Sequence, residues 1–175
     1  FAYSYIRRAF YLCLWTLVML NHGDAQSSSK DNFLVFIQNV QNQILLSAER
    51  KYAIPTSEEL RSWTKAFYYF RMHALDSCNH ILAQQNYSLV QVADHQSGHV
   101  YDVFRENLPI KKGWGTFVYN RRHAKRLFIN VTHPADDGFV ARIGSQLFQK
   151  TRAEWLYVAG TKKTDNINNV SLDAA

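Results

Sequence analysis

The segment Thr132-His133-Pro134-Ala135-Asp136-Asp137 brings an imidazole and two carboxylates together within a few residues. A histidine followed three residues later by a carboxylate can place a nitrogen and an oxygen on one metal ion, and these ligand types suit zinc. Zinc lowers the pKa of a bound water and polarises a carbonyl group, which is the chemistry of amide and ester hydrolysis. Because catalytic zinc normally takes three protein ligands, His133 and Asp136 form an incomplete set by themselves.

The same segment has a purely structural interpretation. Asp136 or Asp137 is a suitable N-cap for a helix that follows, and Pro134 fits the turn leading into its first residues. His133 then ends a strand and forms a local hydrogen bond. The residue pattern alone leaves the metal site and the helix cap as open alternatives.

The apolar pattern around this segment predicts a strand, a helix and a strand at residues 126–132, 137–150 and 154–159. Such a βαβ unit requires a parallel strand pair and a right-handed crossover. In open α/β sheets, ligands bind beyond the carboxyl ends of the strands, which is where His133 is expected.

The preceding residues predict the remaining elements. A helix is expected from Asp31 to Ala48, and a longer second helix from a capping box at residues 56–59 to Leu82. Two strand-like runs at 88–93 and 100–105, joined by the turn-forming residues 94–99, predict a hairpin, and a further strand is expected at 116–119. The expected fold is therefore α/β, with N-terminal helices followed by a mixed sheet that contains the βαβ unit.

A second candidate site is basic and aromatic. Arg121 and Arg122 lie in the predicted turn between strands 116–119 and 126–132, among further basic residues and near Trp114, Phe117 and Tyr119. Arginines can bind a carboxylate bidentately, and basic side chains beside exposed aromatics can bind an anionic polymer. The ordinary alternative is a solvated turn, and the sequence contains no specific nucleic-acid motif.

The first 25 residues have the pattern of a secretory signal peptide. Arg7 and Arg8 precede the apolar run from Ala9 to Leu20, and small residues precede a cleavage site before Gln26. This run is shorter than the ~20 residues of a spanning helix. Residues 26–175 then form a single α/β domain, which is expected to be secreted or periplasmic. Either the whole domain lies within this range, or the domain continues past residue 175. The alternatives for residues 1–25 are a buried first helix or an uncleaved anchor, which is the only membrane attachment expected.

The stretch from Gly113 to Gly160 resembles a poorly characterised group of secreted bacterial proteins with a His-Pro-x-x-Asp signature. More distantly it resembles zinc-dependent exopeptidases and deacylases of the carboxypeptidase type. This resemblance implies a three-layer, hydrolase-like fold in which His133 and Asp136 are zinc ligands. Those families supply another histidine from a later strand, whereas no histidine follows His133 here. The third ligand therefore lies beyond residue 175, or the chain is an inactive copy. His95, His99 or His123 could substitute only if the predicted hairpin or basic loop folds over the end of the strand.

Two functions follow from the sequence. The first is a secreted metal-dependent hydrolase of amide or ester bonds, in which His133 and Asp136 bind zinc and Arg121 or Arg122 binds an acidic substrate. The second is a non-catalytic exported protein that binds an anionic ligand through the basic aromatic loop. The lone Cys78 of the mature domain is expected to pack as a small apolar residue.

Overall fold

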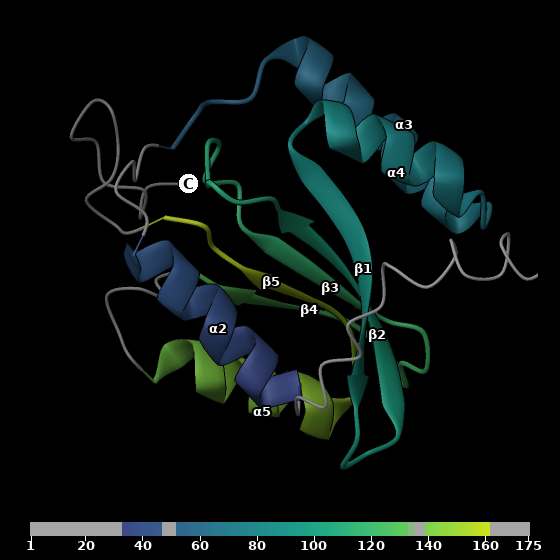
Figure 1. Ribbon diagram of the computed structural model, residues 1–175. Coiled ribbons are helices and arrows are strands. Elements are labelled where there is room, and N and C mark those ends of the chain that lie inside the picture. The colour runs from purple at the N-terminus through teal and green to yellow at the C-terminus, as the bar shows by residue number, and fades with distance from the viewer. Residues whose placement is uncertain (1–32, 47–51, 133, 135–138, 162–175) are drawn as a thin grey trace, which may run out of the picture.

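The structure is a computed structural model that describes residues 33–46, 52–132, 134 and 139–161. Within these ranges the chain forms four helices and a five-stranded mixed sheet, which confirms the expected α/β fold. In chain order the elements are α2 (Phe33–Leu46), α3 (Ser57–Arg71), α4 (Leu75–Gln84), β1 (Tyr87–Asp94), β2 (His99–Glu106), β3 (Thr116–Asn120), β4 (Lys125–Val131), α5 (Val140–Thr151) and β5 (Ala153–Val158) (Figure 1).

The sheet has the strand order β1-β2-β3-β5-β4. Neighbouring strands are antiparallel from β1 to β5, and β5 is parallel to β4. The predicted hairpin and the predicted βαβ unit with its parallel pair are both confirmed. Because β5 lies between β3 and β4, β4 is an edge strand of the sheet.

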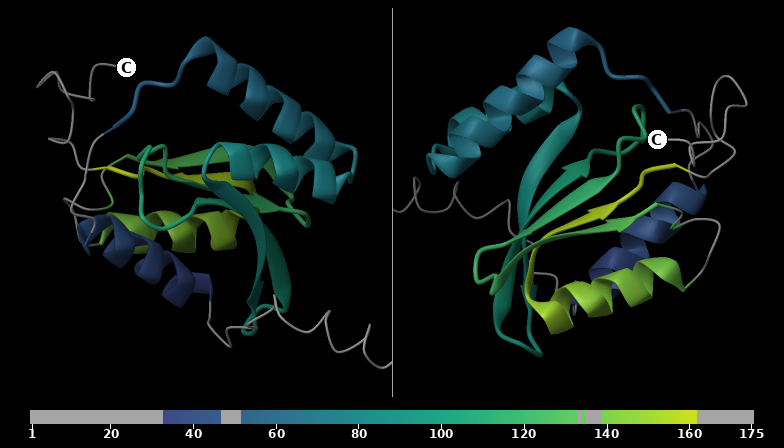
Figure 2. Two further views of the ribbon diagram at one scale, coloured as in Figure 1. Left: turned by 45° about the horizontal axis from the view of Figure 1, so that its top comes forward. Right: turned by 180° about the vertical axis from the view of Figure 1, so that it is seen from behind.

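Helices cover both faces of the sheet, giving three layers. α2 and α5 lie on one side, and α3 and α4 lie on the other (Figures 1 and 2). Successive strand residues point to opposite faces, so Val118 joins the core under α2 and α5 while Phe117 and Tyr119 pack on the α3 side. Cys78 is fully buried in the second core, as expected, and its burial raises the pKa of the thiol to about 11. None of the described helices is long and apolar enough to cross a membrane.

The second predicted helix is in fact two helices, α3 and α4, which pack against each other. His73 adopts a left-handed backbone conformation with φ of 57°. Its N–H donates to the Phe70 carbonyl, and the Ala74 N–H donates to the Tyr69 carbonyl, which is the hydrogen-bond pattern of a Schellman motif. The sequence prediction missed this helix end because the left-handed position holds histidine rather than the usual glycine.

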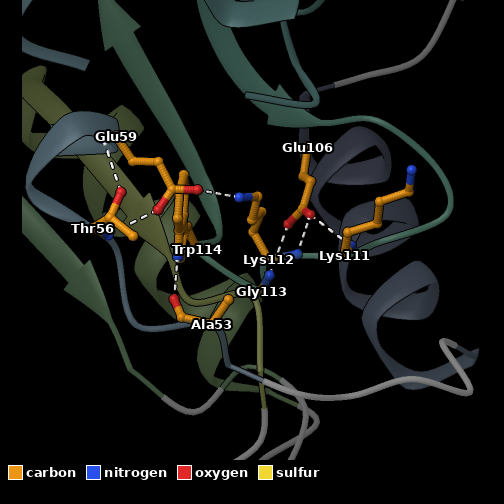
Figure 3. Close-up of polar contacts among 8 residues, drawn as sticks. All are labelled: Ala53, Thr56, Glu59, Glu106, Lys111, Lys112, Gly113 and Trp114. Carbon is orange, nitrogen blue, oxygen red and sulfur yellow. Dashed lines mark hydrogen bonds and ion pairs between the residues drawn. The ribbon is translucent and has the colours of Figure 1, made fainter. Parts of the chain in front are cut away.

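The start of α3 is fixed by the predicted capping box. The Glu59 N–H donates to Thr56 Oγ1, and the Thr56 N–H donates to the Glu59 carboxylate. Glu59 also forms an ion pair with Lys112, which lies in the loop between β2 and β3. Trp114 Nε1 donates to the Ala53 carbonyl over 2.5 Å (Figure 3), and the Ala53 N–H donates to the Lys112 carbonyl over 2.9 Å. The loop is therefore joined both to α3 and to the segment before it.

The same loop closes around a carboxylate from the end of β2. Glu106 accepts hydrogen bonds from the backbone N–H groups of Lys111, Lys112 and Gly113, at 2.7, 2.5 and 2.9 Å (Figure 3). Consecutive backbone N–H groups that converge in this way form a concave site for an anion. Here the carboxylate of Glu106 fills that site, so these three N–H groups are already paired within the protein.

Candidate functional site

The predicted metal corner is described only in part. β4 ends at Val131 and runs parallel to β5, so the residues after it leave from the carboxyl end of a parallel strand pair. His133 and Asp136 lie outside the described residues, as does Asp137. Pro134 is buried, and its carbonyl accepts a hydrogen bond from Gln41, a buried residue of α2. In the described ranges, no group of three or more His, Cys, Asp or Glu side chains is arranged to hold a metal ion.

A groove of about 930 Å³ lies on the α3 side of the sheet, over β3, β5 and β4. Aromatic side chains from α3 and three strands form much of its lining: Phe67, Phe70, Phe117, Tyr119, Phe128 and Trp155. Its polar lining consists mainly of cationic and imidazole side chains: Arg71, His73, Arg121, His123, Arg126 and Glu154. The groove is thus apolar at its floor and basic at its rim.

The floor is a cross-strand row of aromatic residues. In the sheet register Tyr119 is opposite Trp155, and Trp155 is opposite Phe128. The rings of Tyr119 and Trp155 have centroids 4.8 Å apart, and Phe67 of α3 meets Trp155 edge-on at 5.8 Å. Phe128 is 58% exposed. Because β4 is an edge strand and α3 packs over the inner strands, the floor becomes more open toward Phe128.

Arg121 lines this groove and is held by a buried acid. Its Nε and Nη2 donate to the two oxygens of Asp102, at 2.5 and 2.6 Å. The Asp102 side chain is 1% exposed, whereas that of Arg121 is 43% exposed. Gln91 donates a further hydrogen bond to Asp102. The bonds to Asp102 raise the pKa of the Arg121 guanidinium, so this side chain is a fixed cation at the groove wall.

Arg122 has a different position. Its side chain is exposed and is not part of the groove lining. Its backbone N–H donates to Asn120 Oδ1, and its carbonyl accepts from the Arg152 guanidinium. Of the two predicted ligand-binding arginines, only Arg121 therefore lies at the groove.

Sequence reasoning missed part of this groove. Arg71 and His73 come from the end of α3, and Phe128 and Trp155 come from β4 and β5. Strand alternation gave no dependable signal for Phe128, because the register between β4 and β5 shifts between Lys125 and Phe128. The contribution of α3 depended on the packing of a helix against strands far along the chain, for which local pattern gives no signal.

The groove and the metal corner lie at opposite ends of β4. Arg126 and Phe128 are near its first residues, whereas residue 133 follows its last. β4 has 7 residues and spans roughly 20 Å at about 3.3 Å per residue. The structure therefore does not bring Arg121 or Arg122 to the end of β4 from which the chain continues to His133.

Tyr119 adds a neutral donor to the groove. Burial raises the pKa of its hydroxyl, and the nearby carboxylates of Glu154 and Asp102 raise it further. The hydroxyl consequently stays protonated at neutral pH, because a tyrosine already titrates near 10 when unperturbed.

No protein-family model matches this chain, and no curated protein or solved structure is significantly similar to it.

Proposed function

We propose that this domain binds an anionic ligand that also has a flat apolar part, in the groove over β3, β5 and β4. The supporting observation is the composition of the groove lining. Three arginines and two histidines surround an aromatic floor, and the lining contains one carboxylate, Glu154. This is a more specific form of the non-catalytic binding function expected from the sequence.

Two of the arginines are available to a ligand. Arg71 and Arg126 are exposed, and neither forms an ion pair within the described ranges. Arg121 is already paired with Asp102, so it adds little net positive charge to the groove and acts mainly by orienting the bound ligand. An anion at this rim forms charge-assisted hydrogen bonds, which are worth roughly 1.5–3 kcal/mol each.

The test compares the groove arginines with matched arginines elsewhere. Labelled inorganic polyphosphate is titrated against the protein and followed by fluorescence anisotropy at low and high salt. Arg71→Gln and Arg126→Gln should each weaken binding about tenfold, and added salt should weaken binding by the native protein.

Arg61 and Arg142 provide the controls. Both are exposed, Arg61 on α3 outside the groove lining and Arg142 on α5 across the sheet. Arg61→Gln and Arg142→Gln should leave the affinity nearly unchanged. Equal losses in all four variants, or binding that is insensitive to salt, would contradict the groove as the binding site.

We also propose, as a second function, a metal-dependent hydrolase centred on His133 and Asp136. Its support is the parallel β4–α5–β5 unit, since residue 133 follows the carboxyl end of β4. Zinc, the suspected cofactor, would supply Lewis-acid polarisation of an amide or ester carbonyl. His133 and Asp136 would bind the metal, and the acidic substrate of this enzyme would need a binding group other than Arg121 or Arg122.

Metal analysis tests this second function directly. Protein purified without chelator should contain close to one zinc per chain, and His133→Ala should lose it. His80→Ala is the control, because His80 is an exposed residue of α4 that was not a candidate ligand. Metal-free native protein that also fails to bind added zinc would remove the hydrolase proposal.

A further inference from the structure

The open end of the groove combines an exposed aromatic ring with an unpaired cation. Phe128 and Arg126 are two residues apart on β4 and both line the groove. The register of β4 against β5 is irregular between Lys125 and Phe128, so it is the shared groove lining, rather than regular strand alternation, that places the two side chains on the same side. The ring is 58% exposed, and the Arg126 guanidinium forms no ion pair with any described residue.

This combination restricts the chemistry of the ligand. A simple inorganic anion would use Arg71 and Arg126 but would leave the Phe128 ring in water. A neutral sugar would need hydroxyl and amide groups to pair with its own hydroxyls, yet the lining has no Ser, Thr, Asn or Gln side chain. The donors in the lining are the guanidinium and imidazole groups, the Tyr119 hydroxyl and the indole N–H of Trp155. The ligand that fits is planar, aromatic and anionic within one unit.

We propose that the groove binds an unpaired nucleobase together with its phosphate. The base stacks on Phe128 beside Trp155, and the phosphate accepts hydrogen bonds from Arg126 and Arg71. Arg126 and Phe128 line the same groove from one strand, which suits a ligand whose phosphate and base are joined through a single sugar. This inference rests on the proposed anion-binding function and specifies its ligand.

The size of the groove sets the length of strand it accepts. Its 930 Å³ is near the upper end of the range of roughly 300–1,000 Å³ for small-molecule sites, so it has room for more than a single base. A base in a duplex is stacked and paired, and it cannot lie on the floor of a groove without leaving the helix. The site is therefore selective for unpaired bases.

The experiment compares four labelled or competing probes by fluorescence anisotropy. They are a single-stranded oligonucleotide, its duplex, an abasic strand of the same length and charge, and a mononucleotide as competitor. The single strand should bind at least tenfold more tightly than the abasic strand, because stacking of each base on an aromatic side chain contributes a factor of this order. The duplex should bind no better than the abasic strand.

Phe128→Ala is the informative variant, and Phe139→Ala is its matched control. Both rings are exposed, at 58% and 73%, and Phe139 precedes α5 on the other side of the sheet. Phe128→Ala should weaken single-strand binding about tenfold and leave abasic-strand binding unchanged, whereas Phe139→Ala should change neither. Since Phe128 is exposed, circular dichroism and thermal melting should show that both variants fold like the native protein.

The outcomes separate the two proposals. Equal affinity for the single strand and the abasic strand would overturn the nucleobase inference and leave anion binding intact. Binding to neither strand nor to polyphosphate would overturn both. An unchanged single-strand affinity in Phe128→Ala would also overturn the stacking site. Competition by the mononucleotide at similar affinity supports a free nucleotide as the ligand, and weak competition supports a strand.

Discussion

At the scale of single residues, the groove depends on a cation whose position is set by a buried acid. Arg121 was predicted from the sequence as a ligand-binding residue, but its partner Asp102 was not. The two are 19 residues apart and lie on different segments, and they meet because β2 pairs with β3 with Asp102 opposite Tyr119. Such a pairing depends on strand register, which a local sequence pattern does not specify.

The Arg121–Asp102 pair should stabilise the fold as well as the groove. Arg121→Met leaves the buried Asp102 carboxylate with Gln91 and without its charged partner. Removing one member of a buried pair is strongly destabilising, so the free energy of unfolding should fall by about 3 kcal/mol. Urea denaturation measures the change.

Arg122→Met is the matched control for this variant. Its side chain is exposed, and the hydrogen bonds of Arg122 described above use backbone atoms. Its free energy of unfolding should stay within roughly 0.5 kcal/mol of the native value. A similar loss of unfolding free energy in both arginine variants would mean that the ion pair with Asp102 makes no specific contribution to stability.

At the scale of elements, strands were easier to predict than helix ends. Short apolar runs bounded by turn-forming residues located all five strands to within a few residues, because strand-forming side chains and turn residues are local signals. The capping box at Thr56 was also visible, since it uses specific residue types at fixed spacing. The break at His73 was not visible, because a left-handed histidine has no distinctive local pattern.

The cap of α3 should make stability depend on pH. The hydrogen bond from Lys112, helped by the Thr56 N–H, lowers the pKa of Glu59 from its usual 4.5 to about 2. A carboxyl group with a lowered pKa stabilises the fold above 4.5, and this stabilisation is lost as pH falls from 4.5 to about 2. Glu59→Gln should therefore be less stable than the native protein at neutral pH, with a difference that shrinks across this interval.

Chemical denaturation at a series of pH values checks this expectation. Glu58→Gln is the control, because Glu58 is the exposed neighbour in the same first turn and is not part of the capping box. A stability difference between native protein and Glu59→Gln that stays constant from pH 5 to pH 2 would contradict the role given to Glu59.

At the scale of the whole molecule, the two candidate sites differ in how far sequence could predict them. The metal corner is a run of six residues, from Thr132 to Asp137, so its chemistry can be recognised locally. The groove gathers residues from α3, β3, β4 and β5, whose positions in the chain span from Phe67 to Trp155. The part from Phe117 to Arg126, which is basic and aromatic, is close together in the sequence, and that part is what the sequence predicted.

Export is a prediction from the sequence of residues 1–25, and it concerns where the rest of the chain is delivered. If residues 1–25 act as a signal peptide, expression of the full sequence in a secreting host should release a protein that begins at Gln26. Mass spectrometry of the extracytoplasmic fraction gives the N-terminus directly. Replacing Ala25 by a bulky residue should block cleavage, and full-length protein found solely in the cytoplasm would refute export.

The place of β5 inside the sheet also has a consequence for the newly made chain. β3 and β4 emerge from the ribosome before the strand that belongs between them, so neither can complete its pairing until residues 153–158 have been synthesised. During that interval the apolar residues of β4 and the free edge of β3 are open to wrong partners. The synthesis of β5 therefore ends the interval in which these two strands are exposed to aggregation.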